Sequence, residues 1–204
     1  MNRFLPYLAL LTIVLSWLIL GGCASTPPTR FYTLSPLPES DKPGGSGSER
    51  CVSIEIGPVK IPGYLDQPGI VTDLSQNEYR VGEFSRWSEP LEANISRILA
   101  ANLTSLLCTK IVSSFPWKGS VPLDCRVFVE IVRMDGGLGE SAMLDASWTI
   151  FEGAEKRKLL LAKQTHYKET PSDKGYEAYV SAQSRNLGAL SRDIAKAMKT
   201  HERQ

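Results

Sequence analysis

Apolar and polar residues alternate with a period of two along several short stretches of the chain. Residues 52–56 (Val-Ser-Ile-Glu-Ile) and the alternating positions of 142–150 show the pattern most clearly. A strand with one buried face has this period, so both stretches are predicted strands. Shorter apolar runs bounded by turn-forming residues predict five further strands. These cover residues 69–74, 78–84, 111–114, 125–134 and 158–167.

Two longer stretches repeat their apolar residues at steps of three and four, the period of an amphipathic helix. The first follows Pro90, which the first turn of a helix tolerates, with Ser88 or Glu89 as the cap. Its apolar residues are Leu91, Ile95, Ile98, Leu99, Leu103, Leu106 and Leu107. The second helix is predicted over residues 175–199, and its stripe is Tyr176, Tyr179, Val180, Leu187, Leu190, Ile194 and Met198.

The order of these elements predicts an α+β domain of two layers. The predicted domain begins with strands, continues through a helix to an antiparallel meander over residues 125–167, and closes with a second helix. This order favours a mostly antiparallel sheet with both helices on one face. A position on a membrane surface is the alternative for the first helix. Its polar face has no basic cluster, which disfavours this alternative.

The chain begins with a different pattern, an uncharged apolar run from Leu8 to Leu20 that ends in Gly21-Gly22-Cys23. A membrane-spanning helix needs about 20 apolar residues, and this run has the length of a signal-peptide core. Leu20-Gly21-Gly22-Cys23 resembles the bacterial lipobox. We therefore expect cleavage before Cys23, a thioether-linked diacylglycerol on its thiol and a further acyl chain such as palmitate on its amino group. An uncleaved N-terminal anchor is the alternative.

The residues after Cys23 predict the destination and the domain boundaries. An aspartate next to the lipidated cysteine retains such proteins in the inner membrane, whereas Ala24 and Ser25 favour the periplasmic face of the outer membrane. Residues 1–22 are then a signal peptide, 23–50 a tether rich in Pro, Gly and Ser, and 51–200 the folded domain. Within the tether, residues 31–34 have strand propensity and are able to dock on the domain.

The net charge of the mature chain disfavours one class of partner, nucleic acid. Removing residues 1–22 takes away a single basic residue, Arg3, and leaves 22 Lys and Arg against 22 Asp and Glu. Nucleic-acid binding depends on clustered basic residues. A neutral chain without a basic run is therefore not expected to bind nucleic acid.

Three cysteines remain for the periplasm, an oxidising compartment that permits disulfides. Cys108 ends the first predicted helix and Cys125 opens a predicted strand, so we expect a Cys108–Cys125 disulfide that leaves Cys51 unpaired. Three reduced, buried cysteines are the main alternative. A metal site is not expected, because the chain has no CxxC pair with a nearby histidine.

Candidate catalytic residues are few. The chain has only two histidines, His166 in a predicted strand and His201 near the C-terminus, and neither lies beside a nucleophile elbow. The glycines of residues 136–139 lack the lysine of a phosphate-binding loop and lead into a strand, so they predict a hairpin turn. We expect neither an enzyme nor a cofactor.

Several short motifs together resemble the PqiC family, the auxiliary lipoproteins of ABC-type and paraquat-inducible MCE transport systems. The N-terminal motifs are Phe31-Tyr32-x-Leu34, Pro62-x-Tyr64-Leu65, Gly69-Ile70-Val71, Trp87-x-x-Pro90-Leu91 and Asn102-Leu103. The C-terminal motifs are Met134-Asp135-Gly136, the Trp148 strand and Gly175-Tyr176. Together these motifs span nearly the whole mature chain.

The resemblance implies a fold similar to the N-terminal domain of TolB and an outer-membrane lipoprotein able to form homo-oligomers. It also implies an MCE-domain partner that reaches across from the inner membrane, in a system that moves lipid between the two membranes. A structural envelope lipoprotein and a periplasmic hydrolase are the alternatives. The three cysteines of the domain are not part of the family pattern.

The aromatic residues of these motifs have two interpretations. Tyr64, Leu65 and Trp87 either present an apolar surface to the partner, as aromatic residues often do, or fill the core and cap a helix. The sequence alone leaves both open.

Overall fold

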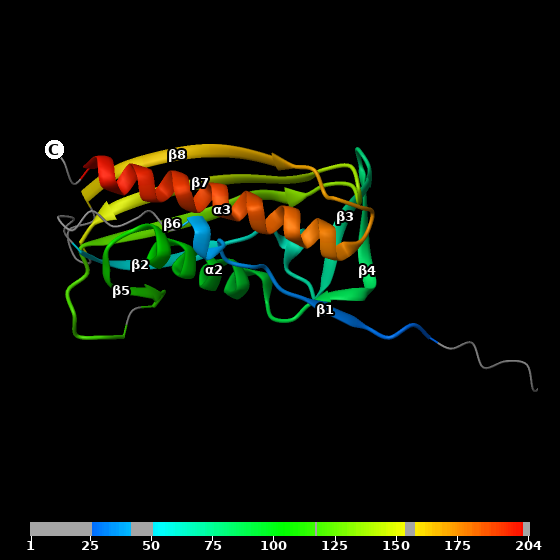
Figure 1. Cartoon of the computed structure of the whole chain (residues 1–204), viewed down its shortest axis with the longest axis horizontal. Coiled ribbons are helices and arrows are strands. Elements are labelled where there is room, and N and C mark those ends of the chain that lie inside the picture. Colours follow the sequence, from blue (N-terminus) through cyan, green and yellow to red (C-terminus); the bar gives the residue numbers. More distant parts are fainter. Residues whose placement is uncertain (1–25, 42–50, 117, 154–157, 202–204) are drawn as a thin grey trace, which may run out of the picture.

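The computed structural model describes residues 26–41, 51–116, 118–153 and 158–201. In this part of the chain, a five-stranded main sheet and a three-stranded small sheet are accompanied by two long helices (Figure 1). The main sheet has the order β5-β2-β6-β7-β8 and the small sheet the order β1-β4-β3.

The bounds of the strands follow the predicted periodicity closely. The main sheet comprises β2 (Val52–Lys60), β5 (Thr109–Ser114), β6 (Cys125–Asp135), β7 (Ala142–Glu152) and β8 (Lys158–Glu169). The small sheet comprises β1 (Arg30–Tyr32), β3 (Gly69–Ser75) and β4 (Glu78–Trp87). Two short 3-10 helices, η1 (Glu39–Asp41) and η2 (Gly63–Leu65), complete the described elements with α2 (Leu91–Leu106) and α3 (Tyr176–His201).

The main sheet is mixed. Strands β6, β7 and β8 form the predicted antiparallel meander, whereas β2 lies between β5 and β6 and pairs with both in parallel. The α+β class is confirmed. The parallel half of the sheet differs from the mostly antiparallel arrangement that we expected. The parallel pairing of β2 with β5 arises because α2 crosses over the sheet between these strands, so that both run in the same direction.

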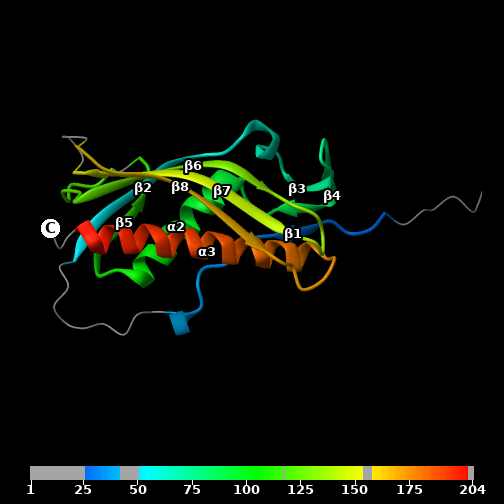
Figure 2. The same cartoon turned by 90° about the horizontal axis from the view of Figure 1, so that it is seen from above.

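Both helices cover the same face of the main sheet, as the apolar stripes predicted (Figure 2). Between the layers, α2 packs on β2 and β5, α3 packs on β7 and β8, and the two helices contact each other. The core is continuous, and its largest fully buried side chains include Trp148 and Tyr179. Each fully buried apolar side chain contributes about 1.5–3 kcal/mol to stability.

Residues 30–37 belong to the folded domain and not to a tether. β1 pairs in parallel with β4, and Leu34 is 1% exposed. The backbone N–H of Leu34 donates to Oδ1 of Asn94 (3.3 Å), and that of Leu37 donates to Oδ1 of Asn102 (2.8 Å). Two buried asparagines of α2 therefore hold this segment in place, and only residues 24–29 separate Cys23 from the first strand. Of the Pro/Gly/Ser-rich stretch, residues 42–50 lie outside the described residues.

The turn between β6 and β7 is the predicted hairpin. Gly136 has φ 136°, a conformation that side chains with a Cβ rarely adopt, and a Cβ there would meet the carbonyl oxygen of Ser141. A glycine is therefore required at this position.

Candidate functional site

The predicted lipidation site lies outside the described residues, since Cys23 precedes Thr26, the first residue that the structure describes. Within the described residues, no helix is long and apolar enough to cross a membrane.

The disulfide joins Cys51 to Cys108, so the predicted Cys108–Cys125 pairing is wrong. Cys51 and Cys108 immediately precede β2 and β5, two adjacent parallel strands, and the N–H of Val52 donates to the carbonyl oxygen of Cys108 (3.0 Å). Cys125 opens β6 on the other side of β2, opposite Ile54, where its side chain is buried. Strand β2 therefore separates Cys108 from Cys125, an arrangement that the order of elements along the chain does not reveal.

The three residues predicted to bind a partner have different environments. Leu65 and Trp87 are 3% and 7% exposed and belong to the core, so the structure corrects their assignment to a surface. Tyr64, on η2, is only partly buried, and its ring stacks on that of Tyr79 from β4 with centroids 4.9 Å apart. Tyr79 is 49% exposed. Tyr64 and Tyr79 therefore form the aromatic surface at this place, and we refer to them as the tyrosine pair.

Asp135, at the end of β6, holds the tyrosine pair. Its carboxylate is fully buried, and one oxygen accepts hydrogen bonds from the hydroxyls of Tyr64 (3.0 Å) and Tyr79 (3.3 Å). The other oxygen pairs with the Arg133 guanidinium, which also reaches Asp73 (3.2 Å). Gln183 of α3 donates to the backbone carbonyl of Asp135 (3.2 Å). Buried charges are stable only when they are paired and hydrogen-bonded in this way.

Burial and the negative charge of Asp135 shift the pKa values of its neighbours. Desolvation, followed by the effect of Asp135, raises the pKa of Tyr64 above its ordinary value, so the hydroxyl remains a donor. The same two causes raise the pKa of the Asp73 carboxyl. One oxygen of Asp73, Oδ1, is buried without a hydrogen-bond partner within the described part of the chain. Asp73 therefore carries an electrostatic penalty that its pairing with Arg133 offsets only in part.

Neither Tyr79 nor Asp135 has a role predicted from the sequence. Asp135 lies in the Met134-Asp135-Gly136 motif of the family resemblance, and this motif is the feature of the sequence that points to it. Tyr79 gave no signal, because its contact with Tyr64 depends on how the small sheet folds against the end of the main sheet.

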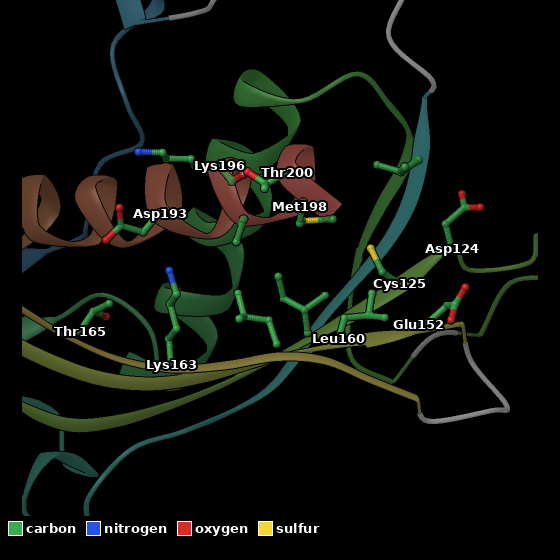
Figure 3. A pocket seen from close by; sticks show the side chains of 14 residues that line it. Asp124, Cys125, Glu152, Leu160, Lys163, Thr165, Asp193, Lys196, Met198 and Thr200 are labelled. Carbon is green, nitrogen blue, oxygen red and sulfur yellow. The ribbon is translucent and has the colours of Figure 1, made fainter. Parts of the chain in front are cut away.

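A cavity of about 700 Å³ lies at the opposite end of the domain, between the last turns of α3 and the sheet. Figure 3 shows Cys125, Leu160 and Met198 around its centre, with Lys163 rising from β8 toward α3. Asp124 and Glu152 lie at the other side of the cavity. Its volume is in the range of about 300–1,000 Å³ that is typical of small-molecule sites.

The candidate catalytic residues do not converge on this cavity. His166 lies on β8, where its Nδ1 is 3.0 Å from Asp145 Oδ1 and its side chain is 75% exposed. The Thr165 hydroxyl at the cavity wall lies 3.3 Å from Trp148 Nε1 and 3.5 Å from the carbonyl oxygen of Ala146. Among the residues described, no cluster of His, Cys, Asp and Glu has a geometry that suits a metal ion.

Comparison with known proteins identifies the class. Residues 32–195 match the family model of the ABC-type transport auxiliary lipoprotein component. The match begins at Tyr32, the last residue of β1, and ends at Ala195, in the second half of α3. The chain belongs to this family of lipoproteins, and the resemblance to the PqiC family is confirmed.

Two curated relatives are intermembrane transport lipoproteins named PqiC, from Escherichia coli (strain K12) and Shigella flexneri. Each is 31% identical to this chain over 108 residues, which is 52% of this chain and 56% of the relative. The chain thus spans about half the length of the curated relatives it matches.

Two crystal structures share the fold. A Xanthomonas campestris protein of the family DUF330 has a TM-score of 0.70 at 10% identity, over 86% of this chain and 100% of that one. An uncharacterised protein has a TM-score of 0.66 at 21% identity, over 84% of this chain and 99% of that one. At these identities the likeness concerns the fold alone.

Proposed function

We propose that this protein is an outer-membrane lipoprotein that serves as a docking component of an MCE-type system for lipid transport between the two membranes. The observation that carries the proposal is the family match across residues 32–195, which covers nearly all of the described domain. The curated relatives are named intermembrane transport lipoproteins, which supports a role in transport between membranes. The lipobox ending at Cys23 supports an acyl anchor on the periplasmic face of the outer membrane.

The proposed partner is an MCE-domain protein that spans the periplasm from the inner membrane. The tyrosine pair is the proposed contact, since aromatic rings with fixed positions are favoured at protein interfaces. Asp135 and Arg133 fix these rings before binding, so little side-chain entropy is lost on docking. In this role the protein is an accessory that hydrolyses no ATP, and it assembles as a homo-oligomer around the end of the partner.

Crosslinking in cells tests the proposal. A photoreactive amino acid at Tyr79, 49% exposed, is expected to capture the MCE protein, which mass spectrometry identifies. The same amino acid at Leu159, 56% exposed and near the cavity end of the domain, is the matched control. Capture of only unrelated envelope proteins from position 79 would contradict the proposed partner.

Variants at Tyr64 separate the interface from the fold. Tyr64→Phe retains the ring that stacks on Tyr79 and loses only the hydrogen bonds of the hydroxyl, to Asp135 and from the backbone N–H of Met134, so capture of the partner is expected to persist. Tyr64→Ala removes the stacking ring, and capture is expected to fall while circular dichroism shows an intact fold. An unchanged yield of crosslinked partner with Tyr64→Ala would exclude the tyrosine pair as the contact.

A further inference from the structure

The short connection between the acyl site and the first strand limits where the bilayer lies. Cys23 is seven residues before Arg30, and an extended chain spans at most about 3.6 Å per residue, so β1 lies within roughly 25 Å of the lipidated sulfur. Residues 26–29 are exposed and include Pro27-Pro28, which stiffens the connection. A tether over the whole of residues 23–50 would have let the domain move well away from the membrane, and docking of β1 removes that freedom.

The small sheet forms one end of an elongated domain, and the chain enters the domain at this end (Figures 1 and 2). The last turn of α3 and the cavity lie at the other end. The part of the domain closest to the bilayer is therefore the small sheet.

An exposed apolar patch occupies this sheet where β1 meets β4. Phe31 of β1 is 66% exposed, the largest exposed fraction of the large apolar residues described, and it pairs with Arg86, which pairs in turn with Gly69 of β3. Paired residues in a sheet share a face. A methyl branch of Val81, 46% exposed, lies over the position where Gly69 would carry a Cβ, so Val81 lies on this face too. We call Phe31, Val81 and Arg86 the β1 patch.

The chemistry of the β1 patch suits the interfacial region of a bilayer. Aromatic and branched aliphatic side chains partition into the region of the headgroups, and arginine keeps its apolar stem there while its guanidinium reaches phosphate. Glu78 and Glu83 of β4 are also exposed, so the small sheet has mixed charge and its contact with lipid depends mainly on the apolar residues.

We infer that the β1 patch rests on the surface of the bilayer that holds the acyl chains, with Phe31 inserted among the headgroups and the cavity end pointing into the periplasm. This inference rests on the proposed lipidation of Cys23. It places the tyrosine pair, at the other end of β4, close to the membrane. A partner that crosses the periplasm would therefore meet the protein where lipid enters or leaves the bilayer.

Depth-dependent quenching tests the contact without relying on acylation. The chain from residue 24 carries an N-terminal hexahistidine that binds vesicles of phosphatidylethanolamine, phosphatidylglycerol and a nickel-chelating lipid. A single new cysteine, Phe31→Cys or the control Leu159→Cys, carries an environment-sensitive dye. Cys51 and Cys108 are joined and Cys125 is buried, so the new thiol is the accessible one.

Lipids with a spin label near the headgroup are expected to quench the dye at position 31 and to leave the dye at position 159 unchanged. Equal quenching at both positions, or none at position 31, would overturn the inference. A dye response at position 31 that appears without vesicles and grows with protein concentration would assign the patch to contact between two copies instead, and would also overturn it.

Removal of the Phe31 side chain gives an independent measure. Phe31→Ala is expected to lower the partition of the untethered chain onto the same vesicles about tenfold, as loss of a buried aromatic ring predicts. Leu159→Ala is the control and is expected to leave the partition unchanged. If both variants bind like the parent chain, the patch does not contact lipid. Failure of acylation in cells would instead appear in the mass of the native protein and would leave these measurements unaffected.

Discussion

Removal of the Cys51–Cys108 disulfide is expected to lower the stability of the domain by several kcal/mol, about 4 in the chain-entropy description. The perturbation is the double variant Cys51→Ser with Cys108→Ser. It removes a link between the residues that precede β2 and β5, which already lie side by side in the folded state. The main effect is therefore on the unfolded chain, which gains the freedom that the link withholds.

The sequence separation of the two cysteines sets the magnitude. They are 57 residues apart, and closure of a loop of this length in the unfolded chain is worth about 4 kcal/mol in the chain-entropy description. For a domain of this size, such a loss corresponds to a fall in Tm of roughly 10 °C.

Urea denaturation followed by circular dichroism, with and without a reducing agent, measures the effect. The parent chain is expected to lose about 4 kcal/mol on reduction, and the double variant is expected to show no further effect of the reducing agent. Cys125→Ala retains the disulfide, so it should keep the sensitivity to reduction. The reasoning is refuted if Cys51→Ser leaves the stability unchanged while Cys125→Ala abolishes the effect of reduction, since that pattern belongs to a Cys108–Cys125 bridge.

The buried groups of the domain give three further predictions. Asp135→Ala leaves two tyrosine hydroxyls without their acceptor and the Arg133 guanidinium with Asp73 alone, and is expected to lower the free energy of unfolding by about 3 kcal/mol in urea titrations. A loss below about 1 kcal/mol would mean that the carboxylate is not needed to hold the rings. Leu34→Ala is expected to cost about 3 kcal/mol, and a negligible cost would show that residues 30–37 do not pack on the domain in solution. The raised pKa of Asp73 means that the folded state binds its proton more tightly than the unfolded state does, so its contribution to stability is lost as pH rises through that folded-state pKa. Asp73→Asn should therefore gain stability relative to the parent chain as the pH rises from the ordinary carboxyl pKa, about 4, through the raised pKa of the folded state. A constant difference between the two chains over this titration would contradict the assignment.

The strands and helices could be predicted from the sequence because one periodic pattern dominates each of them. The alternation in residues 142–150 and the stripe from Leu91 to Leu106 both arise from a single buried face, and the structure confirms both elements. The two-layer α+β class followed from their order. The parallel pairing of β2 did not, since the residues of a strand do not specify which neighbour it joins.

The contacts between distant segments could not be predicted. The partner of Cys108 depends on the position of β2 between β5 and β6, which only the assembled sheet defines. The boundary of the tether depends on Asn94 and Asn102, two polar residues within an apolar stripe whose purpose is visible only once Leu34 and Leu37 lie beside them. The assignment of Trp87 to a partner surface was wrong. The sequence around a tryptophan that precedes a helix is the same whether the side chain fills the core or contacts a partner.

An acyl anchor that places the domain against a membrane is the central claim. Intact-mass measurement of the native protein, extracted in detergent from the cells that make it, tests this directly. We expect a chain that begins at Cys23 and carries a diacylglyceryl group with a further acyl chain, and Cys23→Ala should accumulate as an unprocessed precursor. A native chain that begins at Met1 without acyl groups would contradict the proposed compartment, the partner and the contact with the bilayer.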